Sequence, residues 1–244
     1  MMFVHKAFKL LRVIKNKKYF SVLLRCGVAP VDEHVNVLNK LHLNTVIDVG
    51  ANRGQFALLV RNCFPEAEIF SFEPLSEPAE KYSCVFKNDL KANLFRVAIG
   101  AVKETKNMHV SQADDSSSLL PITSKQNELF PGTAEDHREI VSVDLLENYI
   151  NGSEVKSPSM LKIDVQGYEL EVLNGSLSVL QSFDFVYVEC SYIVLYKDQP
   201  LVHDVIKMLA ANSFELVGVY NSSYDNDGCA IQADFLFKRL SQFK

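Results

Sequence analysis

The feature that most constrains this chain is the stretch at residues 46–54, Val-Ile-Asp-Val-Gly-Ala-Asn-Arg-Gly. Its first four residues form an apolar, β-branched run that is typical of a buried strand. Gly50 and Gly54 let the backbone turn sharply and pass close to a ligand, because glycine has no Cβ. A second apolar run at 69–72 ends at Glu73. A strand, a glycine turn, a helix and a second strand ending in an acid predict a nucleoside site in which the acid binds the ribose hydroxyls.

The spacing of this motif argues against a dinucleotide. The pyrophosphate fingerprint is Gly-x-Gly-x-x-Gly, whereas this chain has Asp-x-Gly-x-x-x-Gly. Asp48 lies just before the turn, where its charge would repel a pyrophosphate and attract an ammonium or sulfonium group. The pattern therefore predicts S-adenosylmethionine as the cofactor. The weaker alternative is an ordinary strand-to-helix turn in which Glu73 is only a strand-end residue.

Composition sets the class of protein. A chain of 244 residues with 48% hydrophobic and 23% charged residues is sufficient for one α/β domain with a large core. The net charge of −5 gives no support for nucleic-acid binding. Because no apolar run is long enough to span a bilayer and no signal-peptide pattern occurs, the expected location is the cytoplasm. Five scattered cysteines without metal-type spacing are expected to be reduced thiols.

The amino-terminal segment differs from the rest of the chain. Residues 1–25 contain no acid, and apolar residues recur there at helical spacing among seven basic side chains: Lys6, Lys9, Arg12, Lys15, Lys17, Lys18 and Arg25. Two interpretations are open. Residues 1–20 could rest weakly on an anionic surface, such as the inner face of a membrane, or the helix could pack on the edge of the domain, which we favour. We accordingly divide the chain into a basic amphipathic segment, 1–30, and one domain, 31–244.

Strands and helices alternate along the domain. This order predicts a doubly wound, mostly parallel α/β sheet with an antiparallel edge. We expect residues 141–150 to form a strand edge and a short helix, and the Ser-, Asp-, Pro- and Gly-containing stretch at 111–137 to form a long loop that covers a ligand. The other expected strands are 46–49, 69–72, 94–99, 159–163, 185–188, 214–220 and 233–237, and the expected helices are 31–41, 78–86, 168–173 and 201–211.

Carboxylates follow several of these strands. Ligands of open α/β sheets bind beyond the carboxyl ends of the strands, where Asp48, Glu73, Asp164 and Glu189 fall. The first two are explained by the cofactor. Asp164 and Glu189 remain as candidates for binding an acceptor and removing its hydroxyl proton during methyl transfer. Alternatively, Asp164 caps a helix and Glu189 is a partly exposed strand-end residue.

Further motifs resemble a known family. Residues 161–175 read Leu-Lys-Ile-Asp-Val-Gln-Gly-Tyr-Glu-Leu-Glu-Val-Leu-Asn-Gly, and Val-Ala-Ile-Gly occurs at 97–100 and Tyr-Val-Glu-Cys at 187–190. Together with the first motif and Phe-Glu-Pro at 72–74, they resemble the FkbM family of S-adenosylmethionine-dependent methyltransferases over roughly residues 35–238. The resemblance implies a Rossmann-like methyltransferase sheet and O-methylation. Many relatives are associated with surface polysaccharide, lipopolysaccharide or other glycan biosynthesis, and others act on natural products.

The resemblance also implies roles for individual residues. Asp164 would face the transferred methyl group, and Gln166 departs from the glutamate common in the family, which makes Asp164 the stronger catalytic candidate. Ser117 lies in a serine–leucine loop that would cover the cofactor or the acceptor. The remaining implied cofactor contacts are Asp48, Gly50, Asn52 and Gly54 for the methionine and ribose, Glu73 for the ribose hydroxyls, and Pro74, Leu75 and Ala98 near the adenine.

These observations predict an O-methyltransferase that acts on a glycan or small-molecule acceptor and has no nucleic-acid partner. One alternative is metal-assisted transfer with Asp164 and Glu189 as ligands of a magnesium-type ion, although no third ligand is evident. Another is a non-catalytic binding protein that keeps the methyltransferase fold. His109, His137 and His203 fall in or near expected loops or on a helix, so they are weaker candidates for a base.

Overall fold

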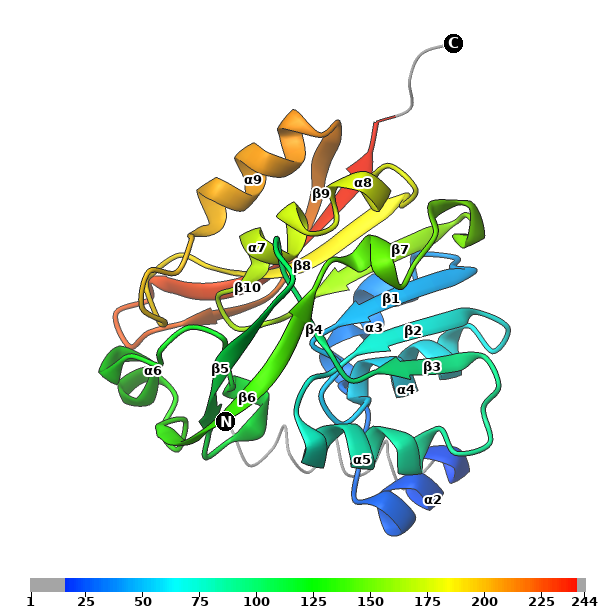
Figure 1. Cartoon of the computed structure of the whole chain (residues 1–244), viewed down its shortest axis with the longest axis horizontal. Coiled ribbons are helices and arrows are strands. Elements are labelled where there is room, and N and C mark those ends of the chain that lie inside the picture. The colour runs from blue at the N-terminus through cyan, green and yellow to red at the C-terminus, as the bar shows by residue number, and fades with distance from the viewer. Residues whose placement is uncertain (1–15, 241–244) are drawn as a thin grey trace.

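The computed structural model describes residues 16–240. Its centre is a seven-stranded sheet in the order β3-β2-β1-β7-β8-β10-β9 (Figure 1). Neighbouring strands from β3 to β8 are parallel, whereas β10 is antiparallel to both β8 and β9. The predicted fold class is therefore confirmed. The strands are β1 (Thr45–Val49), β2 (Glu68–Phe72), β3 (Ala92–Phe95), β7 (Ser159–Ile163), β8 (Phe185–Ser191), β9 (Phe214–Tyr224) and β10 (Ala230–Arg239).

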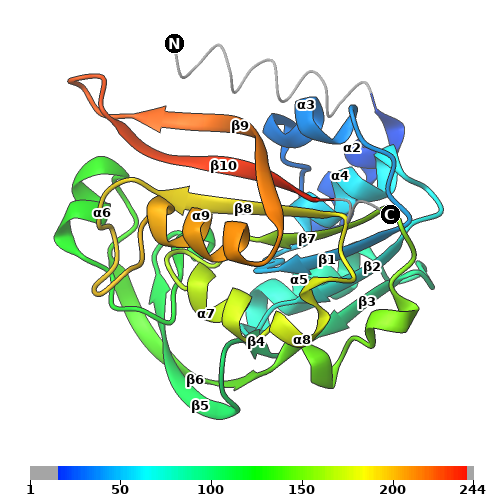
Figure 2. The ribbon, with the colours of Figure 1, turned by 90° about the horizontal axis from the view of Figure 1, so that it is seen from above.

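Helices cover both faces of this sheet because its strands are apolar on both sides. Alternate residues of each strand point to opposite faces, so Val46 and Met160 join the core under α2 to α5, while Ile47 and Leu161 join the core under α7 to α9. Figure 2 shows α2, α3 and α4 on one side and α7, α8 and α9 on the other. These helices are α2 (Lys17–Cys26), α3 (Val35–Leu38), α4 (Gln55–Cys63), α5 (Ser76–Val85), α7 (Glu169–Asn174), α8 (Leu177–Leu180) and α9 (Val202–Ala211).

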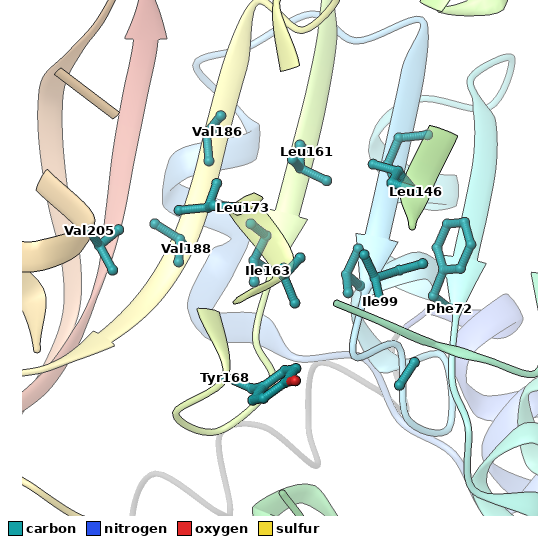
Figure 3. Packing of buried hydrophobic residues seen from close by; sticks show 14 of the residues in the cluster. Phe72, Ile99, Leu146, Leu161, Ile163, Tyr168, Leu173, Val186, Val188 and Val205 are labelled. Carbon is teal, nitrogen blue, oxygen red and sulfur yellow. The ribbon is translucent and has the colours of Figure 1, made fainter. Parts of the chain in front are cut away.

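The core on the α7 to α9 side is continuous across the parallel strands. Figure 3 shows Leu161 and Ile163 of β7 beside Val186 and Val188 of β8, with Leu173 of α7 packed over them. All five side chains are fully buried. This packing fixes the strands against each other and so sets where their carboxyl ends lie.

A second sheet was not predicted. It has the order β4-β6-β5, in which β4 (Ala98–Ile99) pairs parallel with β6 (Glu135–Asp144) and β5 (Glu104–Ser111) pairs antiparallel with it. The single strand expected at 94–99 is therefore wrong, because β3 ends at Phe95 and the chain leaves the main sheet before β4. Ala98, expected at the end of the third strand, instead lies in the second sheet.

The long loop expected at 111–137 is also wrong in part. It contains the short 3-10 helix η2 (Asp114–Ser116), helix α6 (Ser124–Leu129) and the beginning of β6. Residues 135–139 of β6 are Glu-Asp-His-Arg-Glu, of which the first four are exposed, so the strand carries no hydrophobic signal there. Pairing with β5, in which His109 lies opposite Arg138, holds that part of the strand instead.

The amino-terminal region differs from expectation in its cysteines. Cys26 at the end of α2 and Cys84 on α5 form a disulfide, with a Cα–Cα distance of 5.9 Å, so the expectation that all five cysteines are free thiols is wrong. The two helices pack together although the cysteines are 58 positions apart. Residues 1–15 lie outside the described part of the chain, so the membrane-surface contact stays a prediction. No helix within residues 16–240 is long and apolar enough to cross a membrane.

Expected helix 31–41 is shorter in the structure. It consists of the 3-10 helix η1 (Asp32–His34) followed by α3. Two further 3-10 helices, η3 (Leu146–Asn148) and η4 (Gly152–Glu154), connect β6 to β7. Strand β8 extends beyond the expected 185–188, so Glu189 lies within the strand and not after it.

Candidate active site

A cavity of about 710 Å³ lies where the carboxyl ends of β1, β2, β7 and β8 meet η1, η2, β9 and β10. This is the position at which open α/β sheets bind ligands. Two of the residues predicted to form the site, Asp48 and Gly54, are not part of its lining. The others do line it: Gly50, Asn52, Glu73, Pro74, Leu75, Ala98, Ser117, Asp164 and Glu189.

Glycine is required at the two motif positions for different structural reasons. Gly50 has a φ of +80°, and a Cβ at this position would overlap the backbone carbonyl of Asp164. Glycine is thus required where the turn after β1 crosses the end of β7. Gly54 also has a positive φ of +83°, but an added Cβ would lie 2.8 Å from the ring of Tyr82. Gly54 therefore permits the start of α4 to pack on α5.

Glu73 is held by the backbone of the same motif. Its Oε2 accepts a hydrogen bond from the amide of Asn52 at 2.9 Å, and its Oε1 accepts one from the amide of Leu75 at 2.8 Å. The residue is only 5% exposed, and this burial raises the pKa of Glu73 to about 7, against the opposing effect of the two amides. Each oxygen keeps a further lone pair that can accept a ligand hydroxyl in the cavity.

A buried lysine separates two carboxylates beside the glycine turn. Lys162 lies opposite Asp48 in the register of β7 and β1, and its Nζ is 3.3 Å from Asp48 Oδ1 and 3.4 Å from Asp164 Oδ2. Burial alone would lower the pKa of Lys162, but Asp164 and Asp48 hold it above its ordinary value. Burial would raise the pKa of Asp164, but Lys162 and Gln166 hold it below its ordinary value. Lys162 and Asp164 are therefore a charged pair at the cavity wall.

Asp48 lies beneath this pair. The residue has no exposed surface, and burial raises the pKa of its carboxyl even though Lys162 opposes the shift. Lys162 Nζ, 3.3 Å from Asp48 Oδ1, is the cation that offsets the charge of this buried carboxylate. A direct contact between Asp48 and a cofactor stays a prediction.

Gln166 connects the two candidate catalytic carboxylates. Its Nε2 donates to Asp164 Oδ1 at 2.9 Å and to Glu189 Oε2 at 2.7 Å, and its Oε1 accepts from the Tyr196 hydroxyl at 2.9 Å. Gln232 donates to the other oxygen of Glu189 at 2.9 Å. Burial and the nearby charge of Asp164 raise the pKa of Glu189 well above its ordinary value. An amide at 166 supplies the donors that a glutamate there would lack.

A second polar group, which we call the His34 cluster, comprises His34, Tyr187, Asn221 and Asp234. His34 Nδ1 is 2.9 Å from the Tyr187 hydroxyl and 3.4 Å from Asp234 Oδ2. The same Asp234 oxygen accepts hydrogen bonds from Tyr187 at 2.9 Å and from Asn221 Nδ2 at 2.7 Å. His34, Asn221 and Asp234 all line the cavity.

The segment that contains Ser117 crosses the cavity and is fixed on two sides. Arg53, in the turn after β1, pairs with Asp114 at 2.6 Å. On the other side, Ser118 Oγ donates to the carbonyl of Gln166 at 2.7 Å. The Tyr196 hydroxyl, which donates to Gln166 Oε1, lies 3.0 Å from the carbonyl oxygen of Ser116. The segment thus lines the cavity in a fixed position, and its role as a ligand cover stays a prediction.

Sequence reasoning missed Lys162, His34 and Asp234. Lys162 and Asp234 each interrupt an apolar strand, in Met-Leu-Lys-Ile and Ala-Asp-Phe-Leu-Phe, and a lone charge in a buried strand is a usable signal. His34 has no such signal. Of the histidines considered, His109 pairs with Glu135 at 2.6 Å and, like His137 and His203, does not line the cavity. Within the described residues, no group of three His, Cys, Asp or Glu side chains is arranged to hold a metal ion.

The parallel α/β sheet with a cavity at the carboxyl ends of its strands defines a Rossmann-like fold, and comparison with known proteins specifies the family. The model of the methyltransferase FkbM domain matches residues 48–216. The chain therefore belongs to the FkbM methyltransferase family.

Two curated relatives are similar over part of their length. Hexuronic acid methyltransferase AglP of Haloferax volcanii is 30% identical over 142 residues, which cover 58% of this chain and 54% of AglP, so the match spans about half of that protein. The 2-O-methyltransferase NoeI of Sinorhizobium fredii is 26% identical over 188 residues, covering 75% of this chain and 76% of NoeI. Among solved structures, a precorrin-6y C5,15-methyltransferase from Geobacter metallireducens aligns with a TM-score of 0.48 at 9% identity, covering 88% of this chain and 94% of that chain.

Proposed function

We propose that this protein transfers a methyl group from S-adenosylmethionine to a hydroxyl of a sugar or a similar neutral polyol. The observation that carries the proposal is the placement of Glu73. Its carboxylate is fixed by the amides of Asn52 and Leu75 and faces a cavity large enough for a nucleoside and an acceptor. A carboxylate at the end of the second strand suits the two hydroxyls of a ribose.

The rest of the cavity fits the other parts of this cofactor. Leu75, Ala98, Ile99 and Leu119 provide an apolar wall for an adenine. The charge of Asp164 at the cavity wall favours a cationic amino acid portion. When bound, S-adenosylmethionine would supply an electrophilic methyl group.

Charge favours a neutral acceptor over a carboxylate. Lys162 is the only lysine or arginine among the described lining residues, and it is already paired with Asp48 and Asp164. Seven acidic residues line the same cavity: Glu33, Glu73, Asp114, Asp115, Asp164, Glu189 and Asp234. An anionic acceptor such as a hexuronate would meet like charges here without a free cation. AglP carries the name of a hexuronic acid enzyme and NoeI that of a 2-O-methyltransferase, and the lining favours hydroxyl methylation.

The acceptor would be bound at the carboxyl ends of β7 and β8. Asp164 and Glu189 can accept hydrogen bonds from sugar hydroxyls, and Asn221, Ser222 and Gln232 line the same end of the cavity with both donors and acceptors. Such groups hold an acceptor oxygen in line with the methyl group, which is the positioning that group transfer requires.

Cofactor binding is tested by calorimetry on the wild-type protein and Glu73→Ala. We expect the substitution to weaken binding by about 1–3 kcal/mol through loss of charge-assisted hydrogen bonds. The pKa of about 7 adds a pH signature. Ribose hydroxyls would favour the ionised carboxylate, so affinity should fall as pH is lowered below about 7, and Glu73→Gln should remove this dependence. Absence of binding to the folded wild-type protein would contradict the proposal.

Acceptor class is tested by transfer of labelled methyl groups to paired neutral glycosides and hexuronates. We expect methyl ethers on neutral sugars and little esterification of hexuronates. Preferential esterification would refute the argument from charge. Adding a chelator to the same assay distinguishes the metal-assisted alternative. That alternative requires that activity be lost with chelator and restored by magnesium.

A further inference from the structure

The His34 cluster has an arrangement that defines which nitrogen carries the imidazole proton. An ionised Asp234 can only accept hydrogen bonds, so the single proton of the Tyr187 hydroxyl is donated to it. The Tyr187 oxygen is then left to accept from His34 Nδ1, 2.9 Å away. Asn221 Nδ2 lies 3.3 Å from the same Nδ1, but it donates to Asp234 at the shorter distance of 2.7 Å. The shorter contact of Nδ1 with Tyr187 thus favours a neutral His34 with its proton on Nδ1 and a free lone pair on Nε2.

The free nitrogen belongs to a residue that lines the proposed acceptor site. The hydrogen bonds and the ion pair of His34 within residues 16–240 all involve Nδ1. His34 is 9% exposed and lines the cavity together with Asp164 and Glu189. Its ring packs edge-on against Phe56, with centroids 5.3 Å apart, and Lys162 Nζ lies 5.4 Å from the centroid of the same Phe56 ring. His34 and Lys162 thus contact the same aromatic ring at the cavity wall.

We propose that His34 is the general base of the methyl transfer, with Tyr187 and Asp234 as positioning residues; this inference rests on the proposed function. The acceptor oxygen forms its bond to the methyl carbon as the carbon–sulfur bond breaks and its electron pair stays on sulfur. The hydroxyl proton passes to Nε2 of His34. The imidazolium that results is stabilised by Asp234 through Tyr187 and through the 3.4 Å contact with Nδ1.

Asp164 and Glu189, the two carboxylates of the proposed acceptor site, are less suited to this task. Asp164 contacts Lys162 and accepts from Gln166, and its pKa lies below its ordinary value, so it is a weak base. Both oxygens of Glu189 accept side-chain amides, and its raised pKa favours the protonated acid. An imidazole titrates closer to neutral pH, where general bases are most effective.

Charged groups face His34 from several elements. They are Glu33 on its own η1, Lys162 of β7, Asp164 directly after β7, and Asp234 of β10, with the Tyr187 hydroxyl from β8. Burial lowers the pKa of His34 below its ordinary value, although Asp234 opposes this shift. The neutral form is therefore dominant at pH 7, and activity should fall on acidification as the imidazole becomes protonated.

The test compares His34→Gln and Tyr187→Phe with the control His42→Gln, whose side chain is exposed and does not line the cavity. At saturating cofactor, where Glu73 no longer limits binding, we expect His34→Gln to lower kcat about 10²–10⁴-fold and to abolish the acidic limb of its pH profile. Tyr187→Phe should lower kcat about tenfold, and His42→Gln should leave it unchanged. Calorimetry should give the same cofactor affinity for all four proteins.

Nitrogen-15 NMR of the wild-type protein supplies a readout without turnover. We expect a neutral His34 protonated on Nδ1 at pH 7.5, and loss of this preference in Tyr187→Phe. Protonation on Nε2, or a kcat of His34→Gln within threefold of wild type, would overturn the inference. If the wild-type protein binds no cofactor or methylates no hydroxyl, the proposed function fails, and the NMR result still decides whether Nε2 is free.

Discussion

Glu73 and the groups that hold it come from one continuous stretch, residues 52–75, and its hydrogen bonds are to backbone amides. Around Asp164 the wall comes from β7, β8, β10 and η1, and the contacts join side chains that are far apart in the sequence. We call these the cofactor side and the acceptor side. The cofactor side depends on a backbone turn that requires glycine. The acceptor side depends on which charged groups and hydrogen-bond donors lie next to one another. Its specificity can thus change without any change in the glycine motif.

The largest effect is expected on the cofactor side, from Gly50→Ala. The added Cβ would overlap the carbonyl of Asp164 at a backbone φ of +80°, so we expect the free energy of unfolding to fall by about 4–5 kcal/mol. The control is Gly132→Ala, where φ is +92° but an added Cβ meets nothing within 4 Å, which should cost only about 1 kcal/mol. Urea unfolding of both variants measures the difference. Equal losses would show that close approach is not what requires Gly50.

A slightly smaller loss is expected on the acceptor side from Lys162→Met. The substitution keeps much of the side-chain volume but leaves Asp48, with no exposed surface, and Asp164 without their cation. We expect a loss of about 3–5 kcal/mol at pH 8. Lowering the pH should reduce the loss because protonation removes the unpaired charge. The control Lys91→Met removes an exposed pair with Glu66 and should have no measurable effect. A loss that did not depend on pH would indicate a packing defect instead.

The smallest effect is expected from Gln166→Glu, which places a third carboxylate between Asp164 and Glu189 and removes two donated hydrogen bonds. We expect a loss of about 1–3 kcal/mol at pH 8. Like charges raise the pKa of the new carboxyl in the folded state, so the loss should begin as pH rises through its unfolded value, about 4.3, and grow until the folded value is passed. Thermal unfolding from pH 4 to 8 measures this trend, with Gln181→Glu as an exposed control. Equal losses in Gln166→Glu and Gln181→Glu at pH 8 would contradict the expected repulsion between carboxylates on the acceptor side.

The difference between the two sides also explains which features the sequence predicted. Gly50 and Glu73 act through the conformation and amides of their own segment, so their pattern predicted one end of the cavity. The beginning of strand β6 was not predicted because cross-strand pairing, and not burial, holds its first residues. The Cys26–Cys84 bond escaped because it depends on how α2 packs against α5.

The sequence by itself determined the alternation of strands and helices, the glycine turn and the acids near the ends of the strands, because each depends on residues within a few positions of one another. Only the tertiary structure decided that Lys162 lies between Asp48 and Asp164, and that His34 meets a hydroxyl 153 positions away in Tyr187. Those contacts depend on the register between strands and on the order of strands in the sheet. Neither quantity is local, since both are set by how the whole core packs.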